Sequence, residues 1–170
     1  ERSIRGLFNA DIAYERWEVD IQHIKPLDRL RSLSFRAGCG FYTLIDGSKS
    51  FLDYTNFRDN NIPDGWNDEW TGEFSLLSGD WYNLSRYYVR SNVTYESPLL
   101  IAGWMPWVGR FFEKERLYAS TLVVTHLHPY IEVGYGFTTR WASMGLFMAN
   151  RNGKYDGFGV KVGLELFRQW

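Results

Sequence analysis

Cysteine is almost absent from the sequence, since Cys39 is the only one. A single thiol cannot form an internal disulfide, so the fold must be stabilised without one. Long apolar runs are also missing, and without a stretch of about 18 apolar residues we expect no transmembrane helix. Neither sign of charge dominates, because 19 basic and 20 acidic residues give a net charge of −1. No global field therefore attracts nucleic acid, and we expect no nucleic-acid partner.

Residues with catalytic or metal-binding spacing are also scarce. His126 and His128 lie two residues apart, but no third ligand follows at a suitable distance, and we interpret them as part of a turn with Pro129. The acidic segment 59–69 does not fit the register of a calcium-binding loop, because apolar residues occupy ligand positions. Cys39 falls on the apolar face of a predicted strand, which indicates a buried or lipid-facing thiol. We expect no catalytic residue, no metal and no cofactor.

Aromatic residues, in contrast, are abundant. They make up 18% of 170 residues, with 8 Trp, 11 Tyr and 12 Phe. This content is typical of membrane barrels, in which two interfacial girdles are built from aromatic side chains. The length is sufficient for one domain with a sizeable core.

Strict alternation of apolar and polar residues near the C-terminus predicts a β-strand over 157–167. Its apolar face carries valine, leucine and phenylalanine, and its other face carries glycine, Lys161 and Glu165. Such a strand suits either a soluble barrel with an apolar interior or a membrane barrel with a polar lumen. The glycines and charges favour a lumen open to water, and hence the membrane barrel.

The same alternation recurs along the chain and predicts about eight antiparallel strands, of the length that a tilted strand needs to cross a membrane. A change of parity indicates a bulge near Glu15–Arg16. Turns are expected at 25–28, 128–129, 138–140 and 150–154. The predicted strands cover 17–24, 33–41, 70–76, 87–95, 117–124, 131–137, 142–148 and 157–167.

Two longer segments break the alternation. Residues 45–69 are polar and rich in turn-forming residues, which predicts a long loop. Residues 98–116 place aromatic side chains at helical spacing beside basic ones, which predicts a short amphipathic segment at the bilayer interface. If the chain has eight strands and the last one ends in the periplasm, the long loop would lie on the periplasmic side, although long loops of such barrels usually lie outside the cell. One explanation is that residues 141–149 do not cross the membrane.

Charged residues occupy the polar parity of several predicted strands. Because their signs nearly balance, we expect them to pair across the lumen rather than to form a selective pore. The predicted lumen-facing charges are Glu18, Asp20, Arg36, Glu73, Arg86, Arg90, Lys161 and Glu165.

Several motifs resemble a known family of bacterial proteins. They are Ser97-Pro98-Leu99-Leu100, Met105-Pro106-Trp107-Val108-Gly109-Arg110-Phe111, Glu115-Arg116-Leu117-Tyr118 and Tyr130-Ile131-Glu132-Val133-Gly134-Tyr135-Gly136-Phe137. The chain is similar to the C-terminal barrel of Bacteroidota outer-membrane proteins that carry an N-terminal carboxypeptidase-regulatory-like domain. That barrel is related to the BamA and TamA surface-antigen superfamily.

The resemblance implies a transmembrane β-barrel domain over 1–170 that forms the C-terminal portion of a larger barrel. Phe167 and Trp170 resemble the terminal signal that outer-membrane barrels present to their assembly machinery. The superfamily's hallmark is an Arg-Gly-aromatic tripeptide on an inward-folded loop. The nearest match is Arg5-Gly6-Leu7, which departs from it at leucine, so we do not assign it that role.

The expected function is therefore that of a non-enzymatic, BamA-like protein of the bacterial outer membrane, concerned with envelope assembly, translocation or surface display. Its expected partners are outer-membrane lipids, lipopolysaccharide, the assembly machinery and other envelope proteins. Two alternatives remain open. One is a lipid-modifying barrel enzyme that uses His126 or His128 with a nearby serine such as Ser120. The other is a soluble β-barrel that binds an apolar ligand in its interior.

Overall fold

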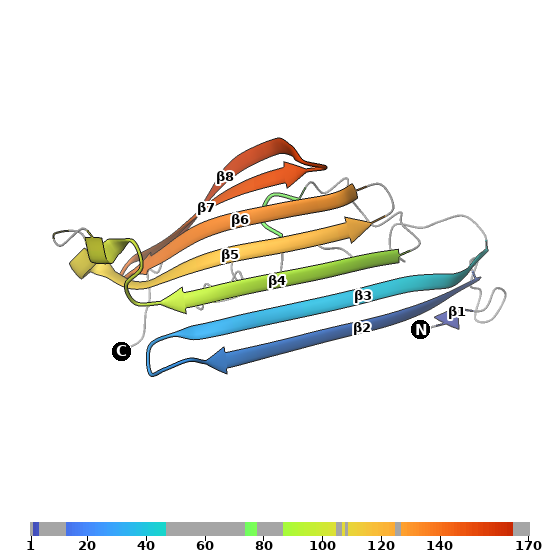
Figure 1. The fold of residues 1–170 in the computed structure, drawn as a ribbon, viewed down its shortest axis with the longest axis horizontal. Helices are drawn as coiled ribbons and strands as arrows, with labels where there is room; N and C mark the ends of the chain where they lie inside the picture. The colour runs from blue at the N-terminus through green and yellow to red at the C-terminus, as the bar shows by residue number, and fades with distance from the viewer. Residues whose placement is uncertain are drawn as a thin grey trace.

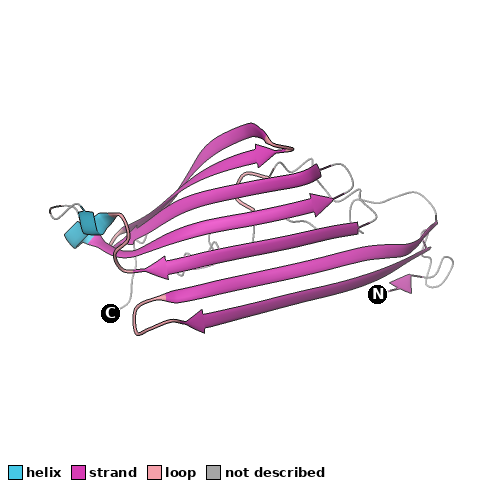
Figure 2. Cartoon of the chain, in the orientation of Figure 1, coloured by secondary structure: helices cyan, strands magenta, loops and turns pink. Residues whose placement is uncertain are grey.

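The computed structural model describes residues 2–3, 13–46, 74–77, 87–104, 107, 109–124 and 127–164. They form one antiparallel sheet in which each strand pairs with the next one along the chain (Figures 1 and 2). Two short 3-10 helices, η3 and η4, lie between β4 and β5. The elements are β1 (Arg2–Ser3), β2 (Ala13–Pro26), β3 (Ser32–Asp46), β4 (Tyr87–Ser97), η3 (Ala102–Trp104), η4 (Gly109–Phe111), β5 (Phe112–Val124), β6 (Leu127–Thr139), β7 (Ala142–Arg151) and β8 (Lys154–Leu164).

Local turn chemistry sets several strand connections. Between β7 and β8, Asn152 and Gly153 both have positive φ, 51° and 79°, as a two-residue hairpin turn requires. Between β2 and β3, the Asp28 carboxylate accepts hydrogen bonds from the backbone N–H groups of Leu30 and Arg31, each at 2.9 Å. The predicted bulge is confirmed, because the register of β2 against β3 shifts between Glu15 and Arg16.

The prediction of a strand over 70–76 is wrong for the part that the structure describes. Within 74–77 only Phe74 makes an isolated bridge, and β3 pairs directly with β4. Residues 142–151, in contrast, form β7 and pair with β6 and β8 on both sides. Of the two segments, it is thus 74–77 that is not a strand of the sheet. The backbone N–H groups of Ser75 and Leu76 donate to a side chain on another strand, as described below.

Two other boundaries differ from the prediction. His128 and Pro129 lie within β6 rather than in a turn, because Leu127 already pairs with Val124 of β5. The segment predicted over 98–116 is shorter, since β5 begins at Phe112 and pairs with both neighbours. Strand pairing overrides the local turn and helical signals in both places.

The two faces of the sheet differ sharply in chemistry. We call inner the face that segment 74–77 covers, and outer the opposite one. Polar residues such as Arg90, Asn92 and Glu132 are buried on the inner face, whereas Val19 and Val162 on the outer face are 57% and 64% exposed. Further exposed apolar residues of the outer parity are Trp17, Ile21, Phe35, Phe41, Val89, Leu117, Ile131, Val133, Met148, Phe158, Val160 and Leu164.

A small apolar core also lies on the inner face. Segment 74–77, drawn in green in Figure 1, packs Phe74 and Leu77 against side chains from four strands. The Phe74 and Tyr130 rings meet edge to face, with their centroids 5.7 Å apart. The remaining buried members of this core are Tyr88, Leu122, Val124 and Ala149.

The sheet is open in the part of the chain that the structure describes. The order of strands runs from β1 to β8, and these two terminal strands are not paired with each other among the described residues. The prediction of an antiparallel all-β fold is confirmed, whereas closure into a barrel is not seen in these residues. No described helix has the length and apolarity to span a membrane.

Candidate functional site: the polar inner face

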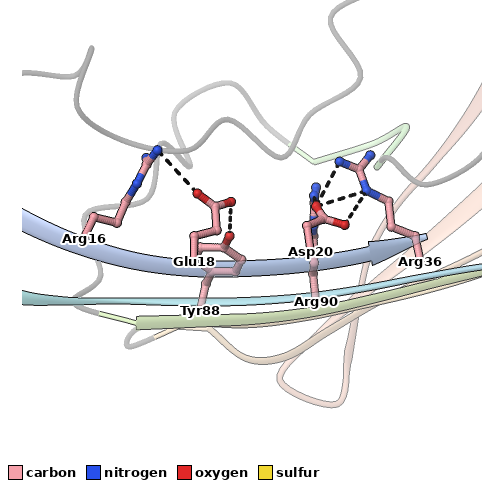
Figure 3. A network of polar contacts seen from close by, with 6 residues as sticks. All are labelled: Arg16, Glu18, Asp20, Arg36, Tyr88 and Arg90. Carbon is pink, nitrogen blue, oxygen red and sulfur yellow. Dashed lines mark hydrogen bonds and ion pairs between the residues drawn. The ribbon is translucent and has the colours of Figure 1, made fainter. Parts of the chain in front are cut away.

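Four of the predicted lumen-facing charges and two further residues form a network of polar contacts that consists of two adjacent groups (Figure 3). In the first group, the Arg36 guanidinium donates to the Asp20 carboxylate, with Nε at 3.1 and 3.2 Å from the two oxygens and Nη2 at 3.0 Å from one. Arg90 donates to the same carboxylate from the other side. The Arg90 side chain is 6% exposed and that of Asp20 is 27% exposed, so the arginine is buried while the carboxylate still reaches water.

The second half of the network surrounds Glu18. Its carboxylate lies 3.4 Å from Arg16 Nη2 and accepts a hydrogen bond from the Tyr88 hydroxyl. Arg16 and Tyr88 are the members that the sequence analysis did not select. Their signal was present, because both share the polar parity of their strands with Glu18 and Arg90.

Two glycines of β3 make these contacts possible. Asp20 on β2 and Arg90 on β4 are both register partners of Gly38, so they meet across a residue without a side chain. A Cβ on Gly38 would lie 3.0 Å from Arg90 Nε. Glu18 and Tyr88 meet across Gly40 in the same way. Because Gly38 and Gly40 have no side chain, they leave space on the inner face above β3. Side chains of β2 and β4 meet in this space.

The other predicted lumen-facing charges do not join this network within the described residues. Lys161 on β8 lies over the Phe147 ring, with Nζ 5.9 Å from its centroid. Glu73, Arg86 and Glu165 fall outside the described residues, as do Phe167 and Trp170. Glu18, Asp20, Arg36 and Arg90 thus make polar contacts within β2 and between β2, β3 and β4, whereas pairing of the predicted charges across a lumen stays a prediction.

A second site on the inner face binds the backbone of segment 74–77. The Glu132 carboxylate accepts hydrogen bonds from the backbone N–H groups of Ser75 at 2.7 Å and of Leu76 at 2.9 Å. The Tyr130 hydroxyl also donates to it, at 3.1 Å. Glu132 is 3% exposed, so its carboxylate is satisfied by protein donors rather than by bulk water. This anchor was not found from the sequence, because nothing local links residues 57 positions apart.

Glycine also receives the side chain of the anchored segment. A Cβ on Gly159 of β8 would lie 2.3 Å from Leu76 Cδ2, so Leu76 occupies the space above that glycine. Leu76 further packs against Tyr118 and Phe147, whose ring centroids are 5.4 Å apart. Segment 74–77 is thus joined to β6 by hydrogen bonds and to β4, β5, β6, β7 and β8 by packing.

A second buried carboxylate, Glu115, holds the connection between β4 and β5. It accepts hydrogen bonds from the backbone N–H groups of Leu100 at 2.5 Å, Ile101 at 3.1 Å and Ala102 at 3.1 Å. The Tyr135 hydroxyl donates to the same carboxylate. Glu115 is fully buried, so three successive backbone donors of the connection are fixed at the end of the sheet.

The described residues offer little for catalysis or metal binding. No group of three or more His, Cys, Asp or Glu side chains that could hold a metal occurs among them. Ser120 is buried and accepts a hydrogen bond from Asn92 Nδ2 at 2.9 Å. His126 and the side chain of His128 lie outside the described part of the chain. The acidic loop segment 59–69 is likewise not described.

Comparison with known proteins places the chain in a family. A family model for the C-terminal domain of DUF5686, described as a family of unknown function, matches residues 1–137. The chain belongs to the DUF5686 C-terminal domain family. The match includes every residue of the network around Asp20 and Glu18, as well as Glu115 and Glu132. No curated protein and no solved structure matches this member of the DUF5686 family.

Proposed function

We propose that this DUF5686 domain is part of an outer-membrane β-barrel, with its outer face against lipid and its inner face toward a water-filled lumen. The barrel is BamA-like and non-enzymatic, and it acts in envelope assembly, translocation or surface display. Further strands close the barrel by pairing at the two open edges of the sheet. Lipid, lipopolysaccharide and the assembly machinery are its proposed partners.

The observation that carries the proposal is the inverted placement of polar and apolar residues. A soluble sheet packs its apolar face inward and exposes its polar face. Here the buried inner face holds Arg90, Asn92 and Glu132, while Trp17, Val19 and Val162 are all more than half exposed. A large exposed apolar surface is costly in water and stable in lipid. Contact with bilayer lipid would therefore explain why the outer face carries so many exposed apolar side chains.

The soluble alternative requires the opposite arrangement. A barrel that binds an apolar ligand would direct its apolar parity inward. The exposure of Val19, Val89 and Val162 on the outer face counts against it. The enzyme alternative finds no specific support, since the described neighbour of the Ser120 hydroxyl is Asn92 and not a histidine.

Segment 74–77 supports the BamA-like part of the proposal. The BamA and TamA superfamily is characterised by a loop that folds inward against the barrel wall. Segment 74–77 lies between β3 and β4 and is bound to the inner face by Glu132. It does not carry the Arg-Gly-aromatic tripeptide, since its sequence is Phe-Ser-Leu-Leu. The support therefore comes from its position rather than from its sequence.

The corrected strand count also removes the difficulty with loop sides. Without a crossing over 70–76, the end of β3 lies at the same end of the sheet as the ends of β5 and β7. If β8 runs toward the periplasm, as the proposed terminal signal requires, that end faces the cell exterior. The long connection after β3 then emerges on the side where outer-membrane barrels usually carry long loops.

Cys39 provides a direct test of the proposed environment. It is the only cysteine, it is exposed, and it lies between Val19 and Val89 in the register of the outer face. In lipid nanodiscs, a charged maleimide should leave Cys39 unmodified, and the same reagent should label it after denaturation in detergent. As a control, the double variant Cys39→Ser and Lys154→Cys places the thiol in the exposed β7–β8 hairpin, where it should be labelled at once. Equal labelling of both thiols in nanodiscs would refute the membrane proposal.

The role in the envelope needs a cellular measurement. Deletion of the encoding gene should lower the amount of other outer-membrane proteins, measured by quantitative mass spectrometry of isolated membranes. Restoration by the wild-type protein is the control. An unchanged protein content together with altered lipid chemistry would contradict the assembly role and favour the enzyme alternative.

A further inference from the structure

One end of the sheet combines exposed aromatic side chains with an excess of positive charge. The β2–β3, β4–β5 and β6–β7 connections all lie there, as the left side of Figure 1 shows. We call this end the basic rim and define it by the described residues 25–31, 98–104, 107, 109–114 and 140–141. It lies opposite the end from which the long connection after β3 emerges, and it includes the segment bound by Glu115.

The aromatic residues of the basic rim are unusually exposed. Trp104 and Trp107 are 89% and 78% exposed, the highest values of any large apolar side chain in the described chain. Trp141 and Phe111 are 68% and 64% exposed. Tryptophan is enriched where one part of the side chain meets hydrocarbon and its N–H meets polar headgroups.

The exposed charges of the basic rim are mostly positive. Six cations stand against two carboxylates, Asp28 and Glu113, within these residues, and Lys114 Nζ also lies 3.1 Å from a carboxylate oxygen of Glu96 on β4. With Glu96 counted, the excess is three positive charges among the described residues. Arg110 lies over the Trp107 ring, with Cζ 5.8 Å from the centroid, so a cation and an indole are presented together. The six cations are Lys25, Arg29, Arg31, Arg110, Lys114 and Arg140.

The β4–β5 part of the basic rim is held in a fixed shape. Glu115 binds three successive backbone N–H groups of the connection, and Ala102 is 1% exposed beneath it. The two 3-10 helices also pack closely, because a Cβ on Gly109 would lie 2.5 Å from the Ala102 carbonyl oxygen. The backbone that carries Trp104 is therefore held in place by Glu115, and the fold keeps the Trp104 side chain exposed.

We infer that the basic rim binds the headgroups of anionic phospholipids in the leaflet that it faces. The phosphates complement the excess of positive charge, and the indoles and Phe111 occupy the boundary between headgroups and acyl chains. The inference rests on the proposed membrane location and adds to it a lipid class and a set of residues.

The test uses the full chain in vesicles that contain brominated phosphatidylglycerol or brominated phosphatidylcholine. Quenching of tryptophan fluorescence gives the affinity of the protein surface for each lipid. The wild type should prefer phosphatidylglycerol, and the preference should fall in high salt. In the variant R29Q/R110Q, the ratio of the affinity for phosphatidylglycerol to that for phosphatidylcholine should fall about fivefold for each arginine removed. The matched control K154Q, at the opposite end of the sheet, should keep it.

The outcomes separate the inference from the proposed function. If both lipids quench the wild type equally and R29Q/R110Q behaves like the wild type, the inference is overturned while the membrane location stands. If R29Q/R110Q and K154Q lose the same preference, general charge attraction explains the binding and the basic rim has no special role. Absence of quenching by either lipid would overturn both proposals. Both variants alter exposed side chains, and an unchanged heat-modifiable band on unboiled gels checks their folding.

Discussion

Gly40→Ala should destabilise the sheet strongly, because an aromatic ring fills the space above Gly40. An added Cβ would lie 2.4 Å from Tyr88 Cε1 and 3.0 Å from its Cζ. Tyr88 is 1% exposed, so its ring has little free space into which to move. Displacement of the ring would also disturb the hydrogen bond that its hydroxyl donates to Glu18.

The expected magnitude follows from these two effects. Overpacking of a close-packed site costs about 1–3 kcal/mol. Loss of a hydrogen bond to a charged group costs about 1.5–3 kcal/mol, of which a tilted ring would lose only a part. Gly40→Ala should therefore lower the free energy of unfolding by about 2–4 kcal/mol.

Denaturant unfolding in detergent micelles, followed by fluorescence and by mobility on unboiled gels, measures this change. Gly157→Ala is the matched control, since it is another strand glycine, on β8, whose added Cβ would meet nothing within 4 Å. It should alter the free energy of unfolding by no more than about 0.5 kcal/mol. In a Tyr88→Leu background the penalty of Gly40→Ala should shrink, because the ring is gone. Equal effects of Gly40→Ala and Gly157→Ala would refute the reasoning.

Three further predictions concern the two faces and the inner anchors. Val162→Arg should impair folding into bilayers at a cost of about 2–4 kcal/mol, because this outer-face side chain is 64% exposed, whereas Lys161→Glu should be tolerated. Equal folding yields for these two variants in vesicles would contradict the assignment of the faces. Asp20→Ala should cost about 1.5–3 kcal/mol, since it removes a charged acceptor that buried Arg90 contacts. Arg36→Ala removes a side chain that is 26% exposed, against 6% for Arg90, and should cost about 1 kcal/mol or less by the same unfolding measurement; the reverse order would contradict the network. Glu132→Gln should raise hydrogen exchange at the Ser75 and Leu76 amides at least about tenfold, because a charged acceptor of both N–H groups is lost. Unchanged protection of these amides would show that packing of Leu76 alone holds the segment.

The sequence by itself determined where strands β2 to β8 lie and the chemistry of their faces. Alternation is a local property, because successive side chains of a strand point to opposite sides. It therefore placed Glu18, Asp20, Arg36 and Arg90 on one face without any knowledge of pairing. The bulge at Glu15–Arg16 was predictable for the same reason, since an extra residue reverses the parity.

Only the tertiary structure decided which of these residues meet. Asp20 and Arg90 are 70 residues apart and are joined through the register of Gly38 with both strands. Segment 74–77 alternates like a strand, but its backbone donors are bound by Glu132, which lies 57 residues beyond Ser75. His128 and Pro129 carry a turn signal, but pairing of β5 with β6 holds them in a strand. Local patterns fix which way a side chain points, whereas partners depend on register and on contacts between distant parts of the chain.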